Sequence, residues 1–166
     1  MLRKYKIPIT ITAFIFTVIL FYKDSTSRQW FYSQLVELFV PNLITNIEVG
    51  ENLINSEYII LDARSNAEYT ISHLPGSIWI GDDSLAIQRA QIIVNNNEIP
   101  YLIYCSIGYR SQFIGKQLQD SLGIKIVNLE GGIFKWNQKH QLLKDSLDNT
   151  TKEVHPYSFF WGLWRI

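Results

Sequence analysis

The stretch that most constrains the fold is residues 101–111, YLIYCSIGYRS, which joins an apolar run to a glycine-containing loop. The first four residues have the composition of a buried strand, and a helical pattern begins near Ser111. In α/β proteins such a strand lies in the sheet, and the loop that follows lies at its carboxyl end. The stretch therefore places Cys105, the single cysteine of the chain, at the edge of the sheet where ligands bind.

The surroundings of Cys105 favour its thiolate form. Unpaired backbone N–H groups at a helix start stabilise negative charge, and Arg110 adds a permanent positive charge. The thiolate is the nucleophilic form of cysteine. The same N–H groups would cradle an incoming anion. We therefore predict that Cys105 and Arg110 are catalytic and that the other loop residues bind substrate, namely Ser106, Ile107, Gly108, Tyr109 and Ser111.

Four motifs occur in a characteristic order along the chain. They are IILDAR at 59–64, HLPGS at 73–77, the loop CSIGYR at 105–110 and LEGGIFKW at 129–136. In this order they resemble the single-domain rhodaneses, a family of sulfurtransferases. The resemblance covers roughly residues 44–143 and leaves both ends of the chain unexplained.

The resemblance implies a function for the loop. In this family the cysteine accepts a sulfane sulfur from a small anionic donor such as thiosulfate, holds it as a persulfide, and passes it to a thiophilic acceptor. The four residues between Cys105 and Arg110 match the loop length of the sulfur-handling members, whereas related phosphatases have one more. In the family the Asp62-x-Arg64 unit lies near the active-site loop. The resemblance therefore implies a supporting role for Asp62. For Arg64 it leaves a structural role and substrate contact equally open.

The order of apolar and amphipathic segments predicts the fold class. Strands alternate with helices, so we expect an α/β domain with a central parallel sheet and helices on both faces. Strands are predicted near residues 44–49, 58–63, 77–80, 101–104 and 125–129. Helices are predicted from residue 66 and over 82–95, 111–122 and 133–140.

The N-terminal residues 1–27 are predicted to be a membrane anchor or a signal segment. Residues 7–22 contain no charged side chain, and basic residues precede them. The apolar run is slightly short for a spanning helix, so an uncleaved anchor and a cleaved signal both remain open. The excess of positive charge before the run predicts a single-pass protein with a cytoplasmic N-terminus and the domain on the outer, periplasmic or lumenal side. Cleavage would instead give a secreted protein.

Two further segments flank the predicted domain at 44–143. Residues 28–43 are expected to form an amphipathic connecting helix, with Trp30 or Phe31, Leu35, Leu38 and Phe39 at the spacing of one helix face. Residues 144–166 read as a loose polar linker followed by an aromatic tail. Both the helix and the tail are compatible with the membrane interface or with packing on the domain.

Composition limits the other possibilities. The formal net charge is zero, which argues against a nucleic-acid partner. One cysteine permits no intrachain disulfide or Cys-based metal cluster, and the three histidines lack ligand spacing, so we expect no metal or cofactor. The expected partners are the anionic donor, a small or protein thiol acceptor, and the membrane. The alternative is a membrane-tethered binding module with the same fold and little turnover, and loop length disfavours phosphate-ester chemistry.

Overall fold

The structure is a computed structural model that describes residues 24–50, 53, 58–94, 99–139 and 141–162. The predicted apolar segment at 7–22 lies outside the described residues. Within the described ranges, no helix has the length and hydrophobicity that crossing a bilayer requires.

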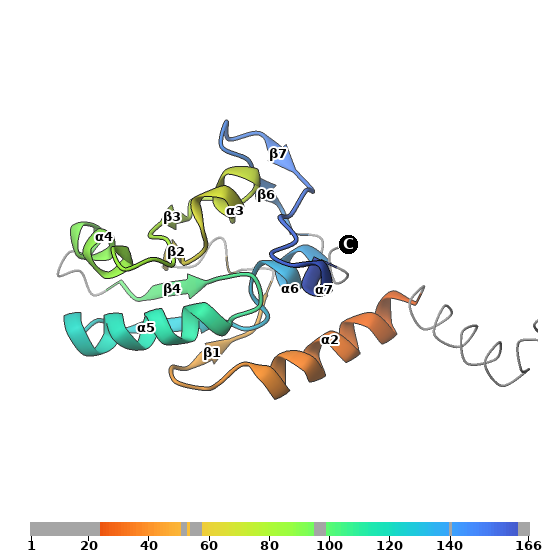
Figure 1. Cartoon of the computed structure of the whole chain (residues 1–166), viewed down its shortest axis with the longest axis horizontal. Helices are drawn as coiled ribbons and strands as arrows, with labels where there is room; N and C mark the ends of the chain where they lie inside the picture. Colours follow the sequence, from red (N-terminus) through yellow and green to blue (C-terminus); the bar gives the residue numbers. More distant parts are fainter. Residues whose placement is uncertain (1–23, 51–52, 54–57, 95–98, 140, 163–166) are drawn as a thin grey trace, which may run out of the picture.

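The domain is built around a five-stranded sheet in the order β1-β5-β4-β2-β3, in which every neighbouring pair is parallel. The predicted central parallel sheet is therefore confirmed (Figure 1). The strands are β1 (Asn46–Ile47), β2 (Ile59–Asp62), β3 (Ile78–Trp79), β4 (Tyr101–Tyr104) and β5 (Ile126–Leu129). The helices are α2 (Ser25–Phe39), α3 (Asn66–Ile71), α4 (Ala86–Ile93), α5 (Tyr109–Leu122), α6 (Gly132–Gln138) and α7 (Phe159–Gly162).

Two hydrophobic clusters cover the two faces of the sheet. Leu61 and Ile103 point to the face covered by α4 and α5, where they pack with Leu118. Leu102 and Tyr104 point to the other face and belong to the cluster that includes residues of α2 and α6. This alternation follows from the period of two along a strand, and it buries β4 completely. The expectation of helices on both faces is confirmed.

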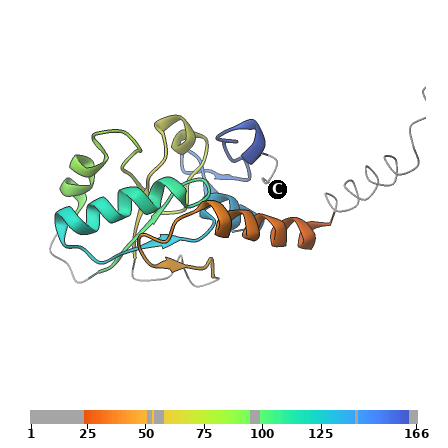
Figure 2. The same cartoon turned by 60° about the horizontal axis from the view of Figure 1, so that its bottom comes forward.

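Helix α2 packs on the domain along α6 (Figure 2). Tyr32 and Val36 are buried in the core cluster, whereas Trp30 and Leu38 are 61% and 75% exposed. The Tyr32 hydroxyl donates to the Gly131 carbonyl at 2.7 Å. Of the two alternatives for this helix, the structure shows packing on the domain, and the residues that carry it are Tyr32 and Val36. Trp30 and Leu38 of the predicted apolar face remain exposed.

The C-terminal segment is more ordered than expected. Strands β6 (Leu143–Lys144) and β7 (Thr150–Thr151) form an antiparallel hairpin where a loose linker was predicted, and Figure 1 shows it standing out beyond α3. Asp145 accepts hydrogen bonds from the backbone N–H groups of Leu147 and Asn149 and so closes the turn. The following residues return to α2, where Trp161 makes edge contacts with aromatic rings of that helix.

Candidate functional site

Cys105 directly follows β4, at the carboxyl end of the sheet. The residue is 1% exposed, and it lines a pocket of about 200 Å³. The backbone N–H of Gly108 points at the sulfur, with 3.2 Å between the nitrogen and Sγ. The sulfur therefore lies in a pocket with at least one main-chain donor aimed at it, as the sequence predicts.

Gly108 makes the turn from the loop into α5. Its φ of +99° lies in the left-handed region, and it caps a helix of 14 residues. A Cβ at this position would lie 3.2 Å from the side-chain nitrogen of Asn128, so the turn has no room for a larger residue. The first backbone N–H groups of an α-helix have no carbonyl acceptor in a preceding turn, and in α5 these groups lie next to Cys105. Their partial positive charge favours an anion there.

The N-terminus of α6 holds the other side of the loop. The N–H groups of Ile133 and Phe134 donate to the carbonyl oxygens of Cys105 and Ser106 at 3.0 and 3.2 Å. This approach requires Gly132, because a Cβ there would lie 2.4 Å from the Cys105 carbonyl oxygen. These two carbonyl oxygens therefore point their partial negative charge toward α6 and not toward Sγ.

Arg110 borders the pocket and is bound by two carboxylates. Its guanidinium donates to both oxygens of Glu68, at 2.9 and 2.7 Å, and to Oδ2 of Asp82 at 2.6 Å. It also donates to the Ser106 hydroxyl at 2.8 Å, and that hydroxyl in turn donates to Glu68. The Arg110 side chain remains 17% exposed. The charge of Arg110 is thus held rigidly beside the loop.

The ion pair shifts the titration of both partners. Burial alone would raise the pKa of Glu68, but hydrogen bonds and charge from Arg110, with help from Ser106 and Ser65, lower it to about 2. Burial alone would lower the pKa of Arg110, but hydrogen bonds to Glu68 and the charges of Cys105 and Glu68 raise it above its usual value. Both groups are therefore ionised throughout the physiological range.

The pocket lining combines the loop with aromatic side chains from both ends of the described chain. Cys105, Ser106, Ile107, Tyr109 and Arg110 form its base. Phe39, Tyr157 and Trp161 form the rest of its wall. In the part of the chain that the structure describes, no group of three or more His, Cys, Asp or Glu side chains is placed to hold a metal ion.

Ser111 lies in the site differently from the prediction. It is fully buried, and its hydroxyl contacts the Gly108 carbonyl oxygen at 3.1 Å and Oδ1 of Asn128 at 2.6 Å. Asn128 in turn donates to Asn46 at 2.8 Å. The Ser111 side chain is therefore a support for the turn at Gly108, and it is not part of the pocket lining.

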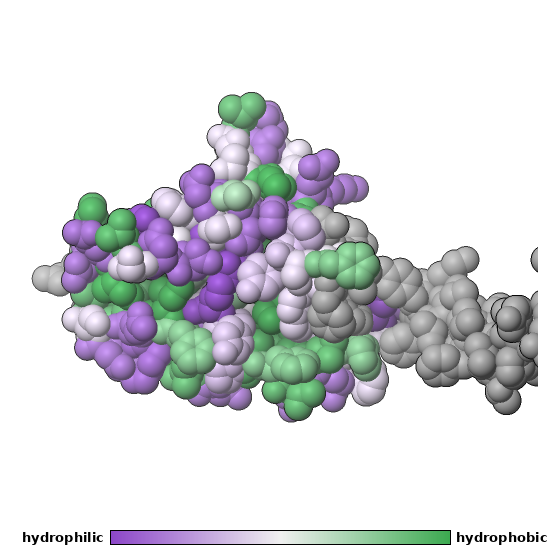
Figure 3. Space-filling model, in the orientation of Figure 1, coloured by the Kyte–Doolittle hydropathy of each residue, from purple (hydrophilic) through white to green (hydrophobic). Residues whose placement is uncertain are grey.

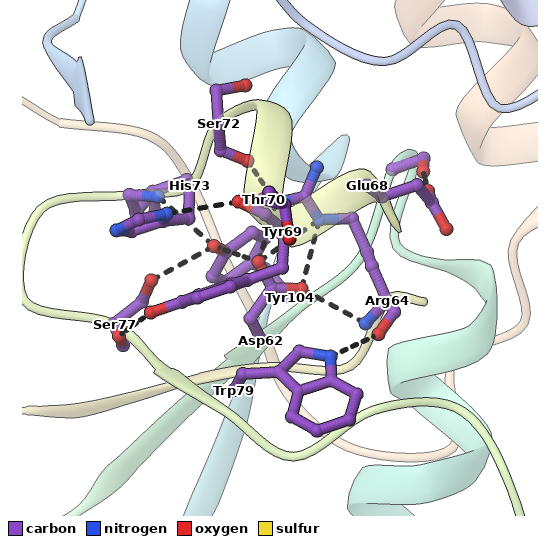
Figure 4. A network of polar contacts seen from close by, with 12 residues as sticks. Asp62, Arg64, Glu68, Tyr69, Thr70, Ser72, His73, Ser77, Trp79 and Tyr104 are labelled. Carbon is purple, nitrogen blue, oxygen red and sulfur yellow. Dashed lines mark hydrogen bonds and ion pairs between the residues drawn. The ribbon is translucent and has the colours of Figure 1, made fainter. Parts of the chain in front are cut away.

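Arg64 and Asp62 form a second, separate cluster (Figure 4). The Arg64 side chain is fully buried, and its Nη2 lies 2.6 Å from Oδ2 of Asp62 and 2.6 Å from the Ser72 carbonyl oxygen. The Tyr104 hydroxyl donates to the same Asp62 oxygen. The supporting role predicted for Asp62 fits this arrangement. Substrate contact by Arg64 does not fit it, because the guanidinium is enclosed and lies outside the pocket lining.

The sequence prediction missed Glu68, Asp82 and the aromatic wall. A signal for Glu68 was present, because Ser65 and Glu68 form a capping box at the start of α3, just after the end of β2. Asp82 is the first residue of the helix predicted over 82–95, but α4 begins four residues later, and Asp82 binds Arg110 instead. No local pattern indicates that Tyr157 lies on Arg110.

The chain is similar in sequence to known proteins. Residues 45–139 match the family described as Rhodanese-like domain. The chain is 33% identical over 87 residues to the adenylyltransferase and sulfurtransferase UBA4 of Kluyveromyces lactis, a match that covers 48% of this chain and 20% of that protein. The chain therefore spans about a fifth of the length of that relative.

Solved structures share the same fold. A rhodanese-related protein from Thermoplasma volcanium superposes with a TM-score of 0.52 and 26% identity, covering 60% of this chain and 97% of that one. A rhodanese-like domain protein from Staphylococcus aureus superposes with a TM-score of 0.50 and 28% identity, covering 68% of this chain and 99% of that one. Nearly the whole of each of these proteins is matched, whereas 40% and 32% of this chain have no counterpart in them.

Proposed function

Because the chain belongs to the rhodanese-like domain family, we propose that it is a sulfurtransferase in which Cys105 carries the transferred sulfur as a persulfide. The observation that supports this most directly is the contact between Sγ and the Gly108 N–H, at the start of a helix and in a pocket bordered by Arg110. A persulfide anion on Cys105 would place its negative charge among the same main-chain donors.

In the first half-reaction the Cys105 thiolate attacks the outer sulfur of the donor. A bond forms between the two sulfurs, and the bond between the outer sulfur and the rest of the donor breaks. With thiosulfate, sulfite leaves with the bonding electron pair and the enzyme gains one sulfur atom. Arg110 stabilises the negative charge around the reacting sulfurs while Glu68 keeps the guanidinium in place.

In the second half-reaction an acceptor thiolate attacks the outer sulfur of the persulfide. The acceptor becomes a persulfide, and Cys105 leaves as a thiolate with the electron pair of the broken bond. The sequence contains no second cysteine that could attack internally. The acceptor is therefore a separate molecule.

The test is the intact mass of the full chain after incubation with thiosulfate. We expect an adduct of one sulfur atom that disappears on addition of a thiol acceptor. Cys105→Ser, which differs by one atom, should form no adduct. If neither thiosulfate nor an organic persulfide loads the wild-type protein, the transferase proposal fails and the binding-module alternative is favoured.

We further propose that residues 1–27 tether the domain to a membrane, with the N-terminus in the cytoplasm and the domain on the outer side. The support is the uncharged run at 7–22 with basic residues before it. Helix α2 begins at Ser25, shortly after the uncharged run at 7–22. It carries the exposed Trp30, a residue type that prefers the membrane interface.

Protease protection in intact cells tests the location. The expected result is that the full chain sediments with membranes and that its C-terminal domain is cut by protease added to the outside of the cytoplasmic membrane. A soluble full-length protein would contradict the tether. Protection of the domain until the membrane is opened would contradict the orientation.

A further inference from the structure

Three side chains of the pocket wall come from outside the family-matched region. Phe39 belongs to α2, and Tyr157 and Trp161 belong to the C-terminal tail, whereas the match covers residues 45–139. The reactive loop is thus provided by the family domain, and much of the pocket opening is provided by segments outside the family match. A substrate bound to Cys105 must pass these aromatic rings.

The aromatic wall is held by packing. Trp161 lies edge-on to Tyr32, with ring centres 6.5 Å apart, and edge-on to Phe39 at 6.4 Å. The tail is anchored just before it by Val154, which is 3% exposed. The backbone N–H of Tyr157 donates to the ring of His155 at 3.0 Å. Trp161 therefore packs against the core cluster, and Phe39 and Tyr157 form the half-exposed rim beside it, so the pocket is formed before substrate binds.

The positive charge of the pocket is already neutralised. Among the described lining residues, Arg110 alone carries a positive charge, and it is paired with Glu68 and Asp82. The three side chains together have a formal charge of −1. The Tyr157 ring covers the guanidinium, with 4.5 Å between the guanidinium carbon and the ring centre. A small dianion entering the pocket would lose its hydration and would share the one cation, Arg110, with two carboxylates, which is more costly than for a singly charged donor.

The surface around the pocket is apolar. Tyr109 packs on Phe113, and both rings are nearly half exposed. Figure 3 shows apolar side chains gathered on this face where α2 and α5 adjoin. Such a wall gains free energy by covering an apolar ligand surface.

We propose that this pocket selects sulfur carriers whose reactive sulfur is attached to an apolar, preferably aromatic, body, and that Phe39, Tyr157 and Trp161 are the specificity-determining residues. The inference rests on the proposed sulfur transfer at Cys105 and specifies its substrate class. For an aromatic thiosulfonate, the Cys105 thiolate takes the outer sulfur, the sulfur–sulfur bond breaks, and the aromatic sulfinate leaves with the electron pair.

Three donors distinguish the effect of an apolar body on the rate from the effect of the donor's charge. Benzenethiosulfonate and methanethiosulfonate carry one negative charge and differ in the apolar body, and thiosulfate carries two charges and no apolar body. Persulfide formation on the full chain is measured with each donor, and each rate is divided by the rate of the same donor with free cysteine. We expect the corrected kcat/KM to be at least about tenfold higher for benzenethiosulfonate than for either other donor.

Variants of the wall test the assignment of residues. Tyr157→Ala and Trp161→Ala should each lower the preference for benzenethiosulfonate over thiosulfate by about fivefold to twentyfold, mainly through the KM for benzenethiosulfonate. Trp161→Phe should retain most of the preference. Phe159→Ala is the matched control, because this ring lies in the same short helix as Trp161, is 89% exposed and does not line the pocket.

The outcomes separate this inference from the proposed function. If all three donors load Cys105 at equal corrected rates, or if folded Tyr157→Ala keeps the preference, the selectivity inference is overturned and sulfur transfer stands. If no donor loads Cys105, the proposed function fails, and this inference fails with it.

Discussion

Two arginine–carboxylate sites lie at the same edge of the sheet and serve different purposes. Arg64 binds Asp62 at the end of β2, with both side chains fully buried. Arg110 binds Glu68 beyond the end of β4, with 17% of its side chain exposed to the pocket. The chemistry of the two pairs is the same, and only the surroundings of the guanidinium differ.

The surroundings decide what each arginine can do. Around Arg64, the protein supplies the partners: Asp62 binds it through two atoms, the Ser72 carbonyl accepts from it, and Tyr104 bonds Asp62 (Figure 4). This cluster links β2 to β4. The Arg110 guanidinium instead faces the pocket on one side, where the ring of Tyr157 lies on it. A guanidinium can act on a ligand only where the fold leaves such an opening.

Arg64→Met should have the largest effect on stability. It leaves the Asp62 carboxylate in the core without its counter-charge, so the free energy of unfolding should fall by about 3–5 kcal/mol. Denaturant unfolding measures this, with Lys116→Met as a control that removes a charge from an exposed pair and should change little. A loss for Arg64→Met below about 1 kcal/mol would contradict the difference between the sites.

Arg110→Met should have the largest effect on sulfur transfer. Loss of the cation beside Cys105 should slow persulfide formation by about a hundredfold. The free energy of unfolding should fall less than in Arg64→Met, by about 1–2 kcal/mol, because Glu68 keeps its hydrogen bonds from Ser65 and Ser106. Stopped-flow or quenched mass measurements with one donor give the rate. Arg89→Met is the control, because this arginine pairs with Asp83 outside the pocket lining. A rate within about twofold of wild type would argue against a role of Arg110 in transfer.

Tyr104→Phe should weaken the buried site alone. The Tyr104 hydroxyl donates to Asp62 and accepts from the Leu74 N–H at 3.1 Å, so its loss should lower the free energy of unfolding by about 1–2 kcal/mol. Tyr109→Phe removes the same group from a ring that is 45% exposed, and its stability should stay within about 0.5 kcal/mol. Equal effects of the two variants on thermal and denaturant unfolding would show that the buried cluster adds nothing.

The pH dependence of stability should show the smallest effect. The pKa of Glu68 is about 2 in the folded protein, below the usual value of 4.5, so its contribution to stability is present above pH 4.5 and is lost as pH falls toward 2. Allowing for solvent around the pocket, the loss should be about 1 kcal/mol greater in wild type than in Glu68→Gln. Parallel curves of unfolding free energy for the two proteins between pH 6 and 2 would contradict this.

Much of the fold follows from local pattern. The four residues of β4 are all apolar or aromatic, and they form the fully buried strand that was predicted. Gly123 ends α5 in the left-handed conformation, as its position after the last apolar residue indicated. Periodicity also located the other strands of the sheet to within one or two residues, because neighbours along the chain share the same strand or helix.

Local pattern failed where a partner came from elsewhere in the chain. The face of α2 that packs on the domain could not be read from the spacing of its apolar residues, because the hydrogen bond from Tyr32 to Gly131 spans 99 positions. Asp82 follows a strand and precedes a helix, which made a capping role reasonable, yet it binds Arg110 at 28 positions distance. The aromatic tail packs on the domain and on α2, which is one of the two alternatives left open for it, but its contact with Arg110 could not be read from its own residues.

The amino-acid sequence by itself determined the order of strands and helices, the position of Cys105 at a strand end, and the length of the loop to Arg110. These depend on residues that are consecutive, so backbone geometry and side-chain periodicity suffice. The tertiary structure alone decided that Glu68 holds Arg110, that Arg64 is enclosed, and that Tyr157 and Trp161 wall the pocket. The physical reason is that burial and charge pairing depend on which distant segments pack together, and only the folded core brings them within contact distance.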